Sequence, residues 1–229
     1  MLYWLIFTIP PLLLGLYAQA KVKSTFAEYS QVRPQRGISG ADAAAAVLQA
    51  SGLPQLSIEP IEGHLTDHYD PSTKTLRLSA DVGSSSSIAA LGVAAHEAGH
   101  AIQDAHGYLP MRVRQSIVPF AQLGSSVGMY AVMGGLILSA QSAFGVSLFY
   151  FGIALFGAAV LFQLVTLPVE FDASRRALVV LEQSGLLASS EIVGARKVLN
   201  AAALTYVAGF LSALGQLLYF VFAFAQSRD

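Results

Sequence analysis

The chain has no cysteine and few charged residues, and both shortages narrow the functions that it can have. Of its 229 residues 12 % are charged, about half the share of an ordinary soluble domain, while 54 % are hydrophobic. Without cysteine there are no disulfides and no thiolate metal ligands, so any zinc must be held by histidine and carboxylate side chains. With a net charge of -1, the chain does not have the excess of basic residues that is typical of nucleic-acid-binding domains, so we expect no nucleic-acid partner.

The longest stretch without charge lies between Arg114 and Glu170, where 55 consecutive residues include no Asp, Glu, Lys or Arg. One bilayer crossing takes about 20 apolar residues, so this stretch fits two crossings joined by a tight turn. We place the two spans near Ile117–Ala140 and Ala143–Leu167, with Gln141-Ser142 as the turn. Backbone polar groups in lipid must be satisfied within the segment, so both spans are predicted to be helical.

Two further apolar runs lie near the ends of the chain. The uncharged run Val198–Ser227 predicts a span near Ala202–Ala225. Met1–Ala20 is also uncharged, and its Ala18-Gln19-Ala20 resembles a signal-peptide cleavage site, but no positive charge precedes it. We therefore expect a retained membrane anchor, with a cleaved signal peptide as the alternative. Pro10-Pro11 in its middle predicts a break or kink in the helix.

The positive residues predict an orientation in the membrane. Of the 13 Lys and Arg residues, all except Arg228 lie within 21–114 or 170–197. With four spans these two segments lie on one side of the membrane, and the positive-inside rule makes that side cytoplasmic. The alternative is that the charges simply belong to the soluble part of the protein, whichever side it occupies.

The same two segments contain the turn and cap residues of a small folded domain. Alternating apolar residues predict strands at Leu56–Ile61 and Thr75–Ser79, with turn residues Asp70–Thr73 between them. Ser84–Ser87 offers helix caps ahead of an alanine-rich helix, Ile88–Gln103. Three more helices are predicted: Asp42–Ser51, Glu170–Leu187 as a continuation of the third span, and Ser190–Leu199 running into the fourth.

His96, Glu97 and His100 form an H-E-x-x-H motif within the alanine-rich helix. Residues four apart share one helix face, so the two imidazoles can reach one zinc ion. Glu97 then lies beside the metal, where it can take a proton from zinc-activated water and pass it to the leaving amine. Ala98 and Gly99 are small and are expected to leave room above the metal. The alternative is an ordinary helix with two hydrogen-bonded histidines.

Such a site needs a third protein ligand, and the residues offer four candidates. Glu170 is the strongest, because it is the first charged residue after the long uncharged stretch and completes a His/His/Glu set. His106 stands ten residues after His96, in register with a longer zinc motif that has a third histidine. That motif requires glycine where this chain has Gln103. His64 and His68 are the remaining candidates.

Four stretches of the sequence resemble the YugP-type bacterial neutral zinc metallopeptidases. They are Gly63–Pro71, Thr75–Ser79, Ala95–Gln103 and Leu167–Ser174, and with the flanking spans the resemblance covers nearly the whole chain. It implies a zinc peptidase of the bacterial cell (inner) membrane, with Zn²⁺ bound by His96 and His100 and with Glu97 as the catalytic base.

The segment that begins at Glu170 is also similar to the E-x-x-A-D segment of the HtpX-type membrane proteases. The glutamate of that segment is their third zinc ligand, which supports Glu170 here. This chain departs from the pattern because Ser174 replaces the second acidic residue. The departure concerns the residue that supports the ligands, a role that Asp172 also fits.

The resemblance further implies a short strand at Thr66–Asp70 beside the metal-binding helix, where an extended substrate can align by strand addition. His68 or Tyr69 would then face the scissile carbonyl. Arg176 and Tyr206 are the other candidates for stabilising the oxyanion.

The predicted fold is a mainly α membrane protein with about four transmembrane helices and a small α+β zincin-like catalytic domain. That domain contains the HEXXH helix and a short β-hairpin. The predicted function is a zinc-dependent metalloendopeptidase acting on peptides or membrane proteins. The alternatives are a non-catalytic scaffold with a structural zinc site and a transporter, which would need ionisable residues within its spans. The predicted segments are the anchor 1–20, the catalytic parts 21–115 and 169–200, the helical hairpin 116–168 and the last helix 201–229.

Overall fold

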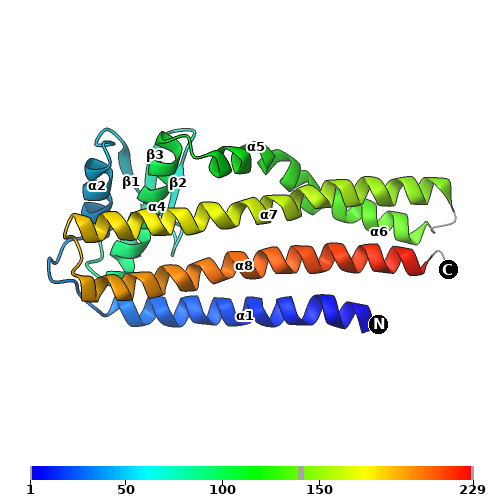
Figure 1. Cartoon of the computed structure of the whole chain (residues 1–229), viewed down its shortest axis with the longest axis horizontal. Coiled ribbons are helices and arrows are strands. Elements are labelled where there is room, and N and C mark those ends of the chain that lie inside the picture. Colours follow the sequence, from blue (N-terminus) through cyan, green and yellow to red (C-terminus); the bar gives the residue numbers. More distant parts are fainter. Residues whose placement is uncertain (1, 139–141, 228–229) are drawn as a thin grey trace. The chain divides into compact units, whose positions relative to one another are not determined.

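Helices make up most of the chain in a computed structural model, which describes residues 2–138 and 142–227 (Figure 1). The helices are α1 (Leu2–Ser30), α2 (Gly40–Ala50), α3 (Ala80–Gly83), α4 (Ile88–Ala105), α5 (Leu109–Leu123), α6 (Met129–Ile137), α7 (Ala143–Gln183) and α8 (Ser189–Gln226). A π-helical segment, Gly124–Gly128, joins α5 to α6. The strands are β1 (Ser57–Ile61), β2 (His68–Asp70) and β3 (Thr75–Ser79).

The chain divides into two compact units. Unit 1 consists of Met1–Ala18, Arg112–Leu167 and Thr205–Asp229, and unit 2 consists of Gln19–Met111 and Pro168–Leu204. Helices α1, α5, α7 and α8 contribute residues to both units.

Four helical stretches are long and apolar enough to cross a membrane, as the uncharged runs predict: Tyr3–Ser30, Leu109–Ile137, Ala143–Gln183 and Ser189–Gln226. Of the break or kink expected at Pro10-Pro11, the break is wrong, because α1 runs through both prolines without interruption. The second stretch begins at Leu109, eight residues before the predicted start. Gln141 of the predicted turn and Ala140 at the predicted span end lie outside the described residues.

The helices of unit 1 pack through direct backbone contacts at glycine. A Cβ atom added to Gly124 would lie 2.1 Å from the carbonyl oxygen of Leu155, and one at Gly135 would lie 2.6 Å from the backbone nitrogen of Phe149. Only glycine permits such an approach, which is typical of small-residue packing between membrane helices. The ring of Phe149 also stacks on Phe224, with 3.7 Å between the ring centroids.

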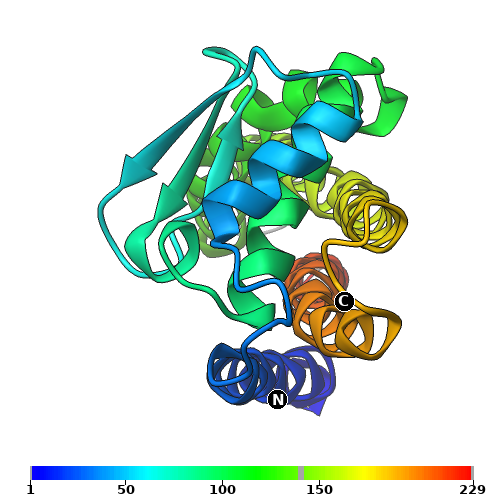
Figure 2. The ribbon, with the colours of Figure 1, turned by 90° about the vertical axis from the view of Figure 1, so that its left-hand side faces the viewer.

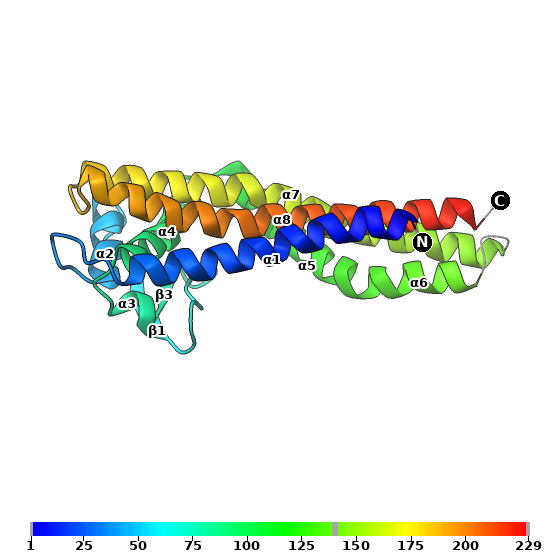
Figure 3. The ribbon, with the colours of Figure 1, turned by 90° about the horizontal axis from the view of Figure 1, so that it is seen from below.

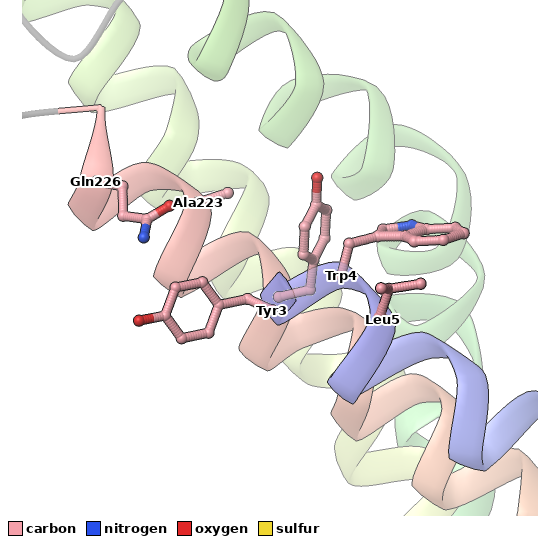
Figure 4. A pocket seen from close by; sticks show the side chains of 6 residues that line it. Tyr3, Trp4, Leu5, Ala223 and Gln226 are labelled. Carbon is pink, nitrogen blue, oxygen red and sulfur yellow. The ribbon is translucent and has the colours of Figure 1, made fainter. Parts of the chain in front are cut away.

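The start of α1 lies beside the last part of α8 (Figure 3), and aromatic side chains of the two helices are in contact there. The rings of Tyr3 and Phe222 stack with 5.5 Å between their centroids. A cavity of about 340 Å³ opens beside them, lined by Tyr3, Trp4, Leu5, Tyr219, Ala223 and Gln226 (Figure 4). Tyrosine and tryptophan are enriched at membrane–water interfaces. None of the lining side chains is a metal ligand.

Unit 2 contains a three-stranded sheet in the order β1-β3-β2. β2 and β3 form a hairpin, with Tyr69 opposite Leu76. A short hairpin was correctly predicted, but its first strand is β2 and not the predicted strand Leu56–Ile61, because β1 runs parallel to β3. α4 packs against β2, β3 and α2 (Figure 2). Fully buried Leu76 of β3, Leu48 of α2 and Leu91 of α4 belong to the core of this unit.

Side-chain caps define where the helices of unit 2 begin. Ser39 and Asp42 form a reciprocal capping box at the start of α2. The Ser87 side chain accepts a hydrogen bond from the Ala90 N–H at the start of α4, within the predicted serine run. α7 continues from the uncharged run through Glu170, as predicted.

Candidate metal centre

α4 presents three polar side chains in an otherwise small-residue and apolar helix segment. His96 and His100 are one turn apart, and their ring centroids are 4.7 Å apart with nearly perpendicular planes. Both lie on the same face because residues i and i+4 are neighbours on a helix. Glu97 is partly buried beside them.

Glu170 of α7 lies beside the two histidines, although it follows His100 by 70 residues in the sequence. Its Oε2 atom lies 3.2 Å from His96 Nε2 and 3.4 Å from His100 Nε2, and the residue is only 2 % exposed. Gly99 permits this approach, since a Cβ atom there would lie 2.5 Å from the carbonyl oxygen of Ala173 on α7. The expectation that Gly99 leaves room above the metal is therefore wrong, because the space is filled by α7.

The three side chains fit a zinc ion. One ligand atom from each of His96, His100 and Glu170 lies within 4.8 Å of the others. Two imidazoles and a carboxylate are the ligand set of catalytic zinc sites that keep a fourth position open. Burial disfavours the charged form of His100, but hydrogen bonding to Glu170 and the charge of Glu97 outweigh it and raise its pKa above the usual value. The carboxylates of Glu97 and Glu170 therefore favour positive charge beside them, as a cation site requires.

The Glu97 carboxylate is held by the backbone of the neighbouring strand. Its Oε2 atom accepts a hydrogen bond from the Tyr69 N–H of β2 at 3.1 Å. Burial raises the pKa of Glu97 above its usual range, although the adjacent histidines act in the opposite direction. A carboxylate with a raised pKa is better suited to exchange protons during catalysis.

Comparison with known proteins agrees with this site. The profile of a family described as "Putative neutral zinc metallopeptidase" matches residues 4–225. The chain belongs to this metallopeptidase family. It is also 45 % identical over 222 residues to the "Putative membrane protease YugP" of Bacillus subtilis (strain 168), covering 97 % of this chain and 96 % of that protein. No solved structure gives a significant match.

The chain has hydrogen-bond partners behind both histidines, and sequence reasoning missed their roles. Ser174 Oγ lies 3.0 Å from His96 Nδ1, and Gln103 Oε1 lies 3.0 Å from His100 Nδ1. The sequence marks Gln103 only as a departure from a longer zinc motif and Ser174 only as the replacement of an acidic residue. The available signal was spacing, because Gln103 stands one helical turn after His100.

The other candidate ligands have different surroundings. His64 Nδ1 pairs with exposed Asp81 at 2.5 Å, and His68 Nδ1 lies 2.9 Å from the Thr66 carbonyl oxygen. His106 caps the end of α4. Among the residues that the structure describes, the one group of at least three ligand side chains contains none of these histidines.

The four candidate substrate contacts occupy separate positions. His68 and Tyr69 lie on β2, and the Tyr69 hydroxyl donates to Asp104 Oδ2 at 2.8 Å. Arg176 Nε donates to Asp172 at 2.5 Å, and its guanidinium lies over a tyrosine ring. Tyr206 lies on α8 in unit 1 and is partly buried.

Proposed function

We propose that this chain is a membrane-embedded zinc metalloendopeptidase in which His96, His100 and Glu170 hold the metal. Glu97 is the general base in this proposal. The supporting observation is that the three ligand side chains converge. The acidic side chain of Glu97 lies next to them and is not one of the three. A purely structural zinc site would have no use for Glu97.

The residues divide the chemistry between binding and proton transfer. Zinc in this site supplies a Lewis acid that acidifies water and polarises a peptide carbonyl. Glu97 takes the proton of the attacking water and later gives it to the leaving amine. The Tyr69 N–H holds Glu97 Oε2, so Oε1 is left to carry the proton. The same hydrogen bond orients the carboxylate before the reaction, which reduces the entropic cost of proton transfer.

Substrate alignment is proposed to use β2, which is an edge strand because β3 pairs with only one side of it. An extended peptide can add to such an edge through backbone hydrogen bonds. The Tyr69 N–H already points toward Glu97 at this edge. His68, Tyr69, Arg176 and Tyr206 remain proposed contacts for the substrate or the oxyanion.

Chelation and reconstitution test the proposed activity. Detergent-purified full-length protein should cleave casein or an unstructured peptide, lose that activity with a zinc chelator, and regain it when stoichiometric zinc is added. Peptide cleavage that persists in the metal-free protein would contradict the proposal. A protein that binds one zinc ion but cleaves no protein or peptide substrate would indicate a structural site instead.

The membrane location proposed for unit 2 is the cytoplasmic side of a bacterial cell membrane. The clustering of positive residues supports it. Because the chain has no cysteine, the labelling of a single introduced cysteine shows on which side of the membrane that residue lies. In intact cells an impermeant maleimide should fail to label Gln55→Cys, an exposed position of unit 2, but should label Ser227→Cys. The reverse labelling pattern would overturn this orientation.

A further inference from the structure

Gln103 is a fully buried polar residue in the wall of the metal site. Its exposed fraction is 0 %, and the neighbouring positions of α4 hold mainly alanine, isoleucine and glycine. Burying a side-chain amide is costly unless its hydrogen bonds are satisfied. We therefore expect Gln103 to have a specific role, and its hydrogen bonds indicate what that role is.

The hydrogen bonds of Gln103 fix the orientation of its amide. The Nε2 atom donates to the carbonyl oxygen of Val169 at 2.8 Å and to Asp172 Oδ2 at 3.0 Å. A backbone carbonyl can only accept, so the amide cannot be turned around without facing oxygen with oxygen. Asp172 is itself held by Arg175 and Arg176, which keep its carboxylate in place. The Gln103 Oε1 atom must therefore face His100.

This orientation has a consequence for the His100 ring. Gln103 Oε1 can only accept a hydrogen bond, and His100 Nδ1 lies 3.0 Å from it. The neutral ring must then carry its proton on Nδ1, which leaves the lone pair on Nε2. Nε2 is the atom that faces Glu170 at 3.4 Å.

We propose that Gln103 is a positioning residue that holds His100 in the Nδ1-protonated tautomer, with the Nε2 lone pair directed at the metal. The inference rests on the proposed zinc site and adds a residue to it. Partners behind a ligating histidine fix its tautomer and orientation, and their loss typically weakens metal binding about 10- to 100-fold.

His96 provides an internal comparison. Its Nδ1 atom lies 3.0 Å from Ser174 Oγ, and a hydroxyl can either donate or accept. Ser174 therefore does not select one tautomer of His96, whereas the acceptor oxygen of Gln103 does so for His100. Removal of Ser174 should weaken zinc binding less than removal of Gln103.

Zinc affinity measured by competition with a chromophoric chelator tests the proposal. Gln103→Met keeps the length of the side chain but removes the acceptor, and it should weaken zinc binding about 10- to 100-fold. Gln103→Glu keeps an oxygen that faces His100 but turns its other oxygen toward the acceptors Val169 and Asp172, so it should lose stability and yet keep more of its zinc affinity than Gln103→Met. Ser174→Ala is the matched control and should lie between Gln103→Met and wild type.

Thermal unfolding of the metal-free variants separates positioning from mere stability. Wild-type affinity in Gln103→Met would overturn the proposal. It would also be overturned if Gln103→Met and Gln103→Glu lost zinc in proportion to their loss of melting temperature. If these variants do not fold, ¹⁵N-histidine NMR of the zinc-loaded wild-type chain decides: a proton on His100 Nδ1 with Nε2 unprotonated supports the proposal, and a proton on Nε2 with Nδ1 unprotonated overturns it. Failure of the proposed function would instead appear as wild-type protein that binds no zinc.

Discussion

Both units of the chain bring helices into backbone contact at glycine, but the contacts serve different purposes. In unit 1 the contact of Gly124 with Leu155 joins two apolar helix faces. In unit 2 the contact of Gly99 with Ala173 brings a helix that carries Glu170 against the two histidines of α4. Close helix contact at glycine thus stabilises a helix pair in unit 1 and assembles a candidate metal site in unit 2.

The units also differ in what their sequences can bind. All five histidines and every Asp or Glu residue except Asp229 belong to unit 2. Unit 1 therefore has almost no side chains that could hold a metal ion. This contrast teaches that chemistry and membrane insertion are assigned to separate parts of the sequence, although single helices contribute to both.

The largest expected effect concerns chemistry in unit 2. Glu97→Gln should lower kcat/KM for peptide cleavage by about 10²- to 10⁴-fold, since the amide cannot accept the proton of water. Bound zinc should remain at the wild-type level, because Glu97 is not one of the three clustered ligands. Glu182→Gln, an exposed position on α7, is the control and should behave as wild type. Full activity in Glu97→Gln would refute the mechanism.

The glycine contacts sharpen the comparison between the units. Gly99→Ala should cost about 1–3 kcal/mol of stability through overpacking, and it should also weaken zinc binding, because α7 must move away with Glu170. Gly124→Ala should cost a similar amount without changing zinc affinity. Gly157→Ala, where a Cβ atom meets nothing within 4 Å, should be neutral or stabilising by up to about 1 kcal/mol.

Thermal unfolding and chelator competition on the three glycine variants provide the readouts. Unchanged zinc affinity in Gly99→Ala would contradict the proposed difference between the units, since the glycine contacts at Gly99 and Gly124 would then have the same effect.

Tyr69 separates two roles within unit 2. Its hydroxyl donates to Asp104, whereas its backbone N–H donates to Glu97. Tyr69→Phe should therefore cost about 0.5–1.5 kcal/mol of stability and leave kcat within a few-fold of wild type. A large fall in kcat with unchanged stability would instead assign the hydroxyl to the oxyanion, as the resemblance to zincins first indicated.

The smallest expected effect concerns a part of unit 2 away from the three ligands. Ser39→Ala removes the cap of α2 and should cost about 1 kcal/mol in thermal unfolding. Hydrogen bonds from Ser39 lower the pKa of Asp42, so this stabilisation is present above the unfolded-state pKa of about 3.9. It is lost as the pH falls through the lower folded-state pKa. A stability difference between wild type and variant that grows on acidification would contradict this account.

Much of the fold could be predicted because uncharged runs and helix caps are local signals. The candidate ligands were also predictable, since the H-E-x-x-H spacing already places His96 and His100 on one helix face. Glu170 followed from its place as the first charge after a long apolar stretch. Its distance from the histidines depends on tertiary packing, which no local pattern encodes.

The errors share a physical reason, which is that long-range contacts override local preference. Pro10 and Pro11 predicted a break, yet α1 is continuous. The turn before β3 was recognised, but the parallel pairing of β1 with β3 joins strands that are not adjacent in the sequence. Gln103 was missed because its importance lies in contacts to α7, 66 and 69 residues away.

The central claim, that three side chains hold one zinc ion, is tested most directly by metal content. Zinc per chain should be measured by mass spectrometry on purified wild type, Glu170→Ala and the control Glu182→Ala, which changes an exposed glutamate of the same helix. The account predicts one zinc ion in wild type and in Glu182→Ala, and a large loss in Glu170→Ala. Stoichiometric zinc in Glu170→Ala would contradict it.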